Sequence, residues 1–151
     1  MKRENLQVAA LESGTVIDHI PSDKVFQAVS LLGLDKMTSP VTIGYNLPSS
    51  KMGTKGIIKV ADKFFTDEEL SRLSVITSHV TLCIIKDYEV VQKRQVDLPD
   101  ILVNIVKCPN PKCICNNEPM ATRFRTVPGS QNLLKCSYCN HEVSLDDIKL
   151  L

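Results

Sequence analysis

Five of the six cysteines in this 151-residue chain lie in two short stretches, "CPNPKCICNN" and "LKCSYCNHE". Cys108 and Cys113 form a C-x4-C pair, and Cys136 and Cys139 form a C-x2-C pair after a spacer of 22 residues. Two such loops facing each other can present four thiolates to one ion, and Zn²⁺ accepts a tetrahedral cage of this kind. Four thiolates leave no open position for water. The spacing therefore predicts one structural zinc ion per chain rather than a catalytic metal.

The remaining thiols and a nearby histidine are weaker candidates for metal ligands. Cys115 follows Cys113 by only two residues, too close for both to chelate with easy geometry, and is interpreted as a spare thiol. His141 is interpreted as a surface residue or as support for a ligand, and Cys83 as a small buried strand residue. Disulfide bonds are the alternative for an exported protein. The start "MKRENLQVAAL" has no apolar signal-peptide core, so we expect a cytoplasmic chain with reduced thiols.

The composition is that of an ordinary soluble globular protein. It is 43% hydrophobic and 23% charged with a formal net charge of +1, so we expect no general attraction to nucleic acid or membranes. No apolar run approaches the roughly 18 residues of a membrane span. The chain contains no GxGxxG, Walker lysine loop, GxSxG or HExxH, and we therefore expect no catalytic site.

The hydrophobic pattern predicts two domains. Over residues 1–97 it indicates strand–helix–strand–strand–helix–strand and one more strand at an edge, which is the order of a ferredoxin-like α+β domain. Such a domain is an antiparallel sheet with two helices on one face. Its clearest signal is a capping box formed by Thr66 and Glu69. The polar stretch "KRQVDLPD" is interpreted as a hinge, and residues 103–151 as a small all-β zinc-binding domain that needs its metal for stability.

The open face of such a sheet can bind a ligand. His19, Lys59 and Lys93 fall on or near strands whose ends could meet, with Asp18 beside them. Cationic groups for phosphates and a carboxylate for ribose hydroxyls would suit a nucleoside triphosphate. Solvated surface lysines are the plainer alternative, and "SSKMGTKG" is interpreted as a flexible surface loop. Because Asp18 and His19 are adjacent in extended chain, we expect their side chains on opposite faces.

Longer motifs carry a resemblance to a known family. The stretches "SGTVIDHIP", "VTIGYNLPS", "KMGTKGIIKV", "DYEVVQK" and "CPNPKC…LKCSYC" together resemble the regulatory chain of aspartate carbamoyltransferase over essentially the full length. The resemblance implies a non-catalytic subunit in pyrimidine biosynthesis, whose N-terminal domain binds ATP, CTP and UTP as allosteric effectors. It also implies self-dimers in a dodecamer of two catalytic trimers and three regulatory dimers. The zinc domain would dock on the catalytic chain.

The resemblance also implies residue roles. Base contacts would come largely from backbone near Leu11 and Tyr88, whereas Asp18 and Lys59 would serve ribose and base, and His19 and Lys93 the phosphates. The full set of implied nucleotide contacts is Ala10, Leu11, Val16, Asp18, His19, Lys59, Tyr88, Val90 and Lys93. The implied zinc ligands are Cys108, Cys113, Cys136 and Cys139, the same four that the spacing predicts. Where well-studied members have an Asn, this chain has Cys83, and a thiol is a poor replacement for an amide.

Two functions of other classes remain as alternatives at this point. Basic residues around the cysteine pairs could serve a stand-alone zinc-ribbon protein that binds nucleic acid, although only Phe124 and Tyr138 are available to stack on bases. A small nucleotide-dependent enzyme is the other alternative. Three measurements would distinguish these functions. Binding of a catalytic partner would favour the regulatory chain, salt-sensitive nucleic-acid binding the zinc ribbon, and nucleotide turnover the enzyme.

Overall fold

The protein is described by a computed structural model of residues 11–77, 79–130 and 132–151. The chain divides into two compact units, Met1–Asp97 and Leu98–Leu151. No helix within the described residues is both long and apolar enough to cross a membrane.

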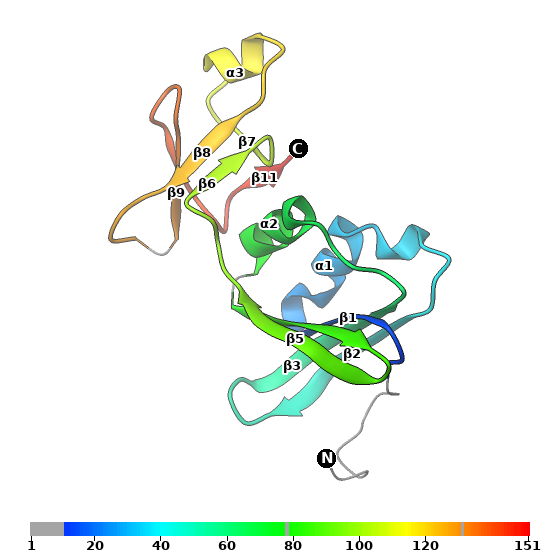
Figure 1. Ribbon diagram of the computed structural model, residues 1–151. Helices are drawn as coiled ribbons and strands as arrows, with labels where there is room; N and C mark the ends of the chain where they lie inside the picture. Colours follow the sequence, from blue (N-terminus) through cyan, green and yellow to red (C-terminus); the bar gives the residue numbers. More distant parts are fainter. Residues whose placement is uncertain (1–10, 78, 131) are drawn as a thin grey trace. The chain divides into compact units, whose positions relative to one another are not determined.

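The first unit is an antiparallel sheet with helices on one face (Figure 1). Its strands are β1 Gly14–Ile20, β2 Val41–Ser49, β3 Gly53–Ala61, β4 Val80–Lys86 and β5 Glu89–Val96. Its helices are α1 Val25–Leu31 and α2 Asp67–Ile76, with short 3-10 helices η2 Ser22–Lys24 and η3 Leu34–Lys36. The strands lie in the order β2-β3-β1-β4-β5. The predicted ferredoxin-like arrangement with an extra edge strand is confirmed.

The capping box predicted at the start of α2 is present. The backbone N–H of Glu69 donates to Thr66 Oγ1 at 3.2 Å, and the backbone N–H of Thr66 donates to Glu69 Oε1 at 3.0 Å. These two bonds satisfy donors that the first turn of a helix leaves without partners. The helix then buries Leu70 and Leu73 against the sheet.

Alternation along the strands separates a buried face of this sheet from an open face. Ile17 on β1 pairs with Ile58 on β3 and with Leu82 on β4, and all three side chains are buried in the core beneath α1 and α2. Directly paired residues share a face, and residues next in sequence point to the other face. The residues adjacent to these three therefore line the open face, away from the helices.

A bulge in β1 places His19 on the open face. Ile17 and Ile20 are both fully buried although they lie three residues apart, so the strand must contain one extra residue between them, and the β1–β3 register shifts there. His19 takes this position with a φ of 60°. Its Nδ1 lies 3.0 Å from Oγ1 of Thr81, the residue that pairs with Asp18. The prediction that Asp18 and His19 point to opposite faces is therefore wrong.

The second unit consists of short antiparallel strands around the cysteines. Its strands are β6 Ile101–Val103, β7 Val106–Lys107, β8 Arg123–Thr126, β9 Leu133–Cys136, β10 Glu142–Ser144 and β11 Lys149–Leu150, with one helical turn, α3 Ile114–Asn117. One sheet has the order β10-β9-β8-β6, and β11 pairs with β7. Apart from cysteines, the buried apolar residues among those described are Leu102, Ile105, Val106, Phe124 and Leu134. Such a small core needs additional stabilisation.

Candidate functional sites

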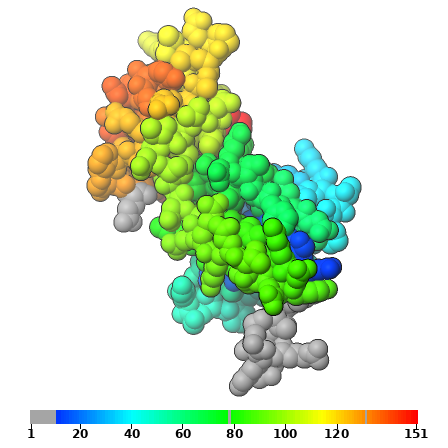
Figure 2. All heavy atoms as spheres, in the orientation of Figure 1, coloured from blue at the N-terminus to red at the C-terminus, as the bar shows by residue number. Residues whose placement is uncertain are grey.

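A row of side chains crosses the open face of the first unit. Val16 on β1 pairs with Lys59 on β3 and with Cys83 on β4, and Cys83 pairs in turn with Lys93 on β5. Because directly paired residues share a face, these four side chains lie next to one another across four strands. All of β5 except Val96 is exposed, and its bright green atoms lie at the surface in Figure 2. A ligand can therefore reach the row from solvent.

Charged groups gather at one end of this face. The Lys55 Nζ lies 2.9 Å from Asp18 Oδ1, and the backbone N–H of His19 donates to the same oxygen at 2.7 Å. Burial lowers the pKa of Lys59, and the negative charge of Asp18 partly offsets that effect. Lys93 lies on the same face, opposite Cys83. Among the described residues, Lys55, Lys59 and Lys93 thus share this face with Asp18. The surface carries excess positive charge, which favours an anionic ligand.

The opposite end of the face is apolar. This end is formed where the chain entering β1 meets the β4–β5 turn. A hydrogen bond joins the two segments there, from the N–H of Tyr88 to the carbonyl oxygen of Glu12 at 2.9 Å. Leu11 precedes this contact, and Tyr88 and Val90 are exposed beside it. Asp18 lies four residues beyond the start of β1, a separation of about 13 Å along the strand. A face of this length, apolar at one end and cationic at the other, matches the polarity of a nucleotide.

The structure brings most of the predicted nucleotide-site residues together on this face. Val16, Asp18, His19, Lys59 and Lys93 lie on it, and Leu11, Tyr88 and Val90 lie at its apolar end. Ala10 lies outside the described residues. The binding roles of these residues stay predictions.

Two residues of the face differ from the sequence interpretation. Lys55 belongs to β3 and not to a flexible loop, and strand alternation would have placed it on the same face as Lys59. Cys83 is half-buried on the open face, so its interpretation as a buried strand residue is wrong. Burial raises the pKa of its thiol, and the charge of Lys93 partly opposes this rise.

All five clustered cysteines meet in the second unit. The sulfurs of Cys108 and Cys139 are 3.7 Å apart, and so are those of Cys113 and Cys136. A tetrahedral zinc site with Zn–S bonds of about 2.3 Å has sulfurs about 3.8 Å apart along each edge. Both pairs fit this separation, whereas the sulfurs of Cys113 and Cys115 are closer, at 3.3 Å.

Two tight turns hold these sulfurs in place. In the first loop, the Asn116 side chain donates to the carbonyl oxygens of Cys108 at 2.9 Å and of Asn110 at 2.7 Å. In the second, the N–H of Asn140 donates to the Cys136 carbonyl oxygen at 2.9 Å, and Asn140 takes a φ of 62°. The local sequence thus folds each cysteine pair into a loop that directs its thiols inward.

Backbone N–H groups point at three of the sulfurs and favour their thiolate forms. These bonds run from Asn110 to Cys108, from Tyr138 and Cys139 to Cys136, and from His141 to Cys139. Burial opposes ionisation of Cys139, but hydrogen bonds, foremost that from His141, lower its pKa to about 7. Burial, followed by the neighbouring Cys113, raises the pKa of Cys115 to about 12. The His141 side chain itself is exposed.

The tightest group of sulfurs nevertheless includes Cys115. The sulfurs of Cys108, Cys113, Cys115 and Cys136 all lie within 4.8 Å of one another, and all four residues are buried. Cys139 is half-buried and outside this group. The donor set of clustered, unpaired thiols fits a thiophilic metal ion. The edge distances and the backbone N–H groups favour Cys139 over Cys115 as the fourth ligand.

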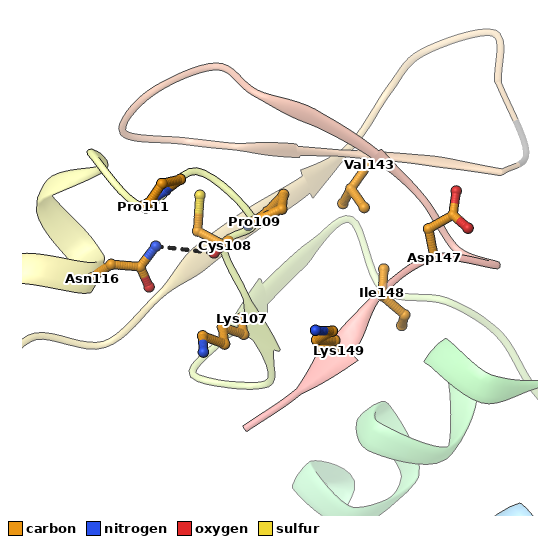
Figure 3. A pocket seen from close by; sticks show the side chains of 9 residues that line it. All are labelled: Lys107, Cys108, Pro109, Pro111, Asn116, Val143, Asp147, Ile148 and Lys149. Carbon is orange, nitrogen blue, oxygen red and sulfur yellow. Dashed lines mark hydrogen bonds between the residues drawn. The ribbon is translucent and has the colours of Figure 1, made fainter.

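A groove of about 490 Å³ opens beside Cys108 (Figure 3). It lies between the first cysteine loop and the C-terminal segment of the same unit. Its walls combine apolar and charged side chains, from Lys107, Cys108, Pro109, Pro111, Asn116, Val143, Asp147, Ile148 and Lys149.

Comparison with known proteins identifies the family. A family model described as "Aspartate carbamoyltransferase regulatory chain, allosteric domain" matches residues 6–97, and one described as "Aspartate carbamoyltransferase regulatory chain, metal binding domain" matches residues 100–149. A protein named aspartate carbamoyltransferase regulatory chain from Bacteroides fragilis is 59% identical over 99% of this chain and 97% of its own length. Proteins with the same name from Phocaeicola vulgatus (61% identity, 99% and 96% covered) and Thermococcus kodakarensis (38% identity, 96% of both chains) are also similar.

These matches cover both units and nearly the whole chain, and they confirm the resemblance found in the sequence. The shared name denotes the regulatory part of an enzyme complex. The chain therefore belongs to the family of aspartate carbamoyltransferase regulatory chains and is a non-catalytic subunit.

Proposed function

We propose that this chain binds ATP, CTP and UTP on the open face of Met1–Asp97 and transmits their effect to the catalytic chain through Leu98–Leu151. The observation that carries the proposal is the open face itself, where Lys59, Val16, Cys83 and Lys93 lie in a row across four strands. Along the strands, this face has an apolar end at Tyr88 and a cationic end at Asp18. Its polarity supports binding of a base at one end and of phosphates at the other.

In this proposal, the base lies between Val16 and Val90, with its edge against backbone near Leu11 and Tyr88. Asp18 and Lys59 bind the ribose and the base. His19 and Lys93 bind phosphate oxygens, and Lys55 joins them because its Nζ already lies at this end of the face. Charge-assisted bonds to phosphate are the strongest polar contacts available here.

We further propose that the metal is Zn²⁺, one structural ion per chain, held by Cys108, Cys113, Cys136 and Cys139. When bound, the ion cross-links the two cysteine loops and stabilises a unit whose apolar core is small. A cytoplasmic location fits this role, because thiols stay reduced there and available to the metal.

Each unit has one surface that suits a protein partner, the catalytic chain on the second unit and another copy of this chain on the first. The groove beside Cys108 combines apolar and charged groups, and we assign it to docking of the catalytic chain. On the first unit, the rings of Phe26 and Tyr45 form an exposed edge-to-face pair 5.3 Å apart on α1 and the edge strand β2. Among the described residues β2 is an edge strand of the sheet, and an edge strand with exposed aromatic residues favours self-association, so we assign it to the regulatory dimer. Three such dimers would join two catalytic trimers.

The test is to titrate the full chain with ATP, CTP and UTP in a calorimeter, and then to mix it with its catalytic subunit, with and without zinc. We expect saturable binding of all three nucleotides without turnover, and a large assembly only when zinc is present. Absence of nucleotide binding would exclude the effector role. Assembly without zinc would exclude the metal-dependent docking.

Cys83 gives a second prediction. Cys83→Asn should strengthen binding of CTP, alone or paired with UTP, by about 1 kcal/mol, or about fivefold, because an amide both donates and accepts hydrogen bonds where a thiol does so weakly. The half-buried position beside Val16 and Lys93 leaves an amide within reach of ligand and solvent. Uninhibited activity should not change, because no nucleotide is bound in that measurement. Inhibition should change, because in this proposal the assembly has two quaternary states and the gain in CTP affinity differs between them.

A nucleotide titration and a thermal melt of the same variant check this prediction. Cys83→Ala is the matched control, because it removes the thiol without supplying any hydrogen-bonding group. A lower melting temperature with no gain in CTP affinity would show that Cys83 only packs in the sheet.

A further inference from the structure

The metal centre contains one thiol more than a tetrahedral ion can bind. Zn²⁺ in structural sites takes four ligands. Five cysteine sulfurs meet here: Cys115 lies within 4.8 Å of Cys108, Cys113 and Cys136, and Cys139 lies 3.7 Å from Cys108. Three sulfurs are therefore common to two alternative sets of four, and the sets differ only in whether Cys139 or Cys115 completes them.

We propose that Cys115 is a reserve ligand that takes the coordination position of Cys139 when that thiolate leaves the metal. This inference rests on the proposed metal site. In the exchange, the metal–sulfur bond to Cys139 breaks and one to Cys115 forms. The Cys115 thiol loses its proton and the departing Cys139 thiolate gains one. The ion therefore keeps four thiolates, and the net charge of the site does not change.

The positions of the two residues explain why Cys139 is the ligand that leaves. Cys139 is half-buried in the turn after β9, whereas Cys115 is buried in the first turn of α3. Reagents in solution therefore reach Cys139 before the other sulfurs of the centre. Cys115 is shielded from them and lies on the metal side of its loop.

The short sequence spacing between Cys113 and Cys115 does not prevent both from binding one ion. Their sulfurs already lie 3.3 Å apart. They need to separate by only about half an ångström to span a tetrahedral edge of about 3.8 Å, which a small side-chain rotation supplies. From the sequence, a separation of two residues seemed too short for both thiols to bind one ion. The chain turns into α3 directly after Cys113, and this turn brings the two sulfurs together.

The test uses the full chain as Cys139→Ser, Cys115→Ser, the double variant and Cys108→Ser. Each is prepared with zinc, passed through a desalting column with a mild chelator, and assayed for metal per chain. The absorption of cobalt-loaded samples counts thiolate ligands independently of activity. We expect both single variants to keep about one ion and a four-thiolate cobalt spectrum. The double variant and Cys108→Ser should fall at least tenfold in metal content.

Each outcome supports or overturns the role of Cys115 as a reserve ligand. If Cys139→Ser loses its metal as completely as Cys108→Ser, whether or not it folds, there is no reserve ligand. If the double variant holds as much metal as Cys139→Ser, a group other than Cys115 completes the site and the inference is overturned. Full metal content in Cys108→Ser would show that Cys115 replaces Cys108 as readily, which overturns the specific exchange with Cys139. Absence of metal from the unsubstituted chain would overturn the proposed metal site itself.

Discussion

Cys136→Ser, or removal of the metal by a chelator or a mercurial, should unfold Leu98–Leu151 and release the catalytic chain while Met1–Asp97 keeps its fold. We expect a large loss of stability because few apolar side chains are buried in the core of the second unit. Structural zinc contributes on the order of 10 kcal/mol to the folding of small modules. That is as much as the whole stability of a typical domain, about 5–15 kcal/mol. Without the ion, the small core cannot offset the conformational entropy of the chain.

Hydrogen exchange measured by mass spectrometry on the full chain resolves the two units separately. Protection should vanish from β8, β9 and β10 and persist in β1, β3 and β4. Sizing with the catalytic subunit should then show catalytic chains free of the regulatory chain. Cys115→Ser is the matched control, since it removes a buried thiol of the same centre but leaves Cys108, Cys113, Cys136 and Cys139 in place. Normal assembly of Cys136→Ser would contradict the metal-dependent docking.

The elements of the fold were predictable because their signals are local. Thr66 and Glu69 are three residues apart and form the same capping box in any context that allows a helix to start there. The apolar alternation of β2 and β4 likewise requires no knowledge of their neighbours. The two cysteine pairs are local too, because each occupies one turn of chain. The order of elements then leaves few topologies open, and the ferredoxin-like arrangement is one of them.

The parts that were not predictable depend on packing across the sheet. The face of His19 is decided by a bulge, and its signal was present in the sequence: two isoleucines, Ile17 and Ile20, at a spacing that a regular strand cannot bury on one side. Lys55 was missed because β3 starts earlier than its apolar run indicates, since pairing with β2 extends it to Gly53. The set of thiols that meet at the metal depends on how the side chains point in the folded chain. The spacing of residues in the sequence does not determine these directions.

Lys93→Ala should weaken binding of ATP and of CTP by roughly 10- to 150-fold. A hydrogen bond to a charged group contributes about 1.5–3 kcal/mol, and each 1.4 kcal/mol is a factor of about ten in affinity. Both nucleotides should lose affinity alike, because phosphates are common to them. Lys93 lies opposite Cys83 on the open face and its side chain is exposed. Its removal should therefore leave stability, metal content and assembly unchanged.

Arg94→Ala provides a matched control from the next position of the same strand. Arg94 pairs with the core residue Leu82, and its guanidinium lies 3.7 Å from the exposed Asp67 at the start of α2, which places it on the helix side of the sheet. Both substitutions remove one positive charge from β5. They change the long-range field by similar amounts but differ in the face from which the charge is lost.

Calorimetry of the two variants at one ionic strength separates a direct phosphate contact from a general effect of charge. If Lys93 contacts a phosphate directly, nucleotide affinity should fall at least about ten times further in Lys93→Ala than in Arg94→Ala. Both variants lose a similar long-range attraction for the phosphates, and screening by salt keeps that loss small. If the two variants bind ATP and CTP equally well, Lys93 touches no phosphate. The assignment of Lys93 to the phosphates would then be wrong, although Lys93 lies on the same face as Cys83 and Val16.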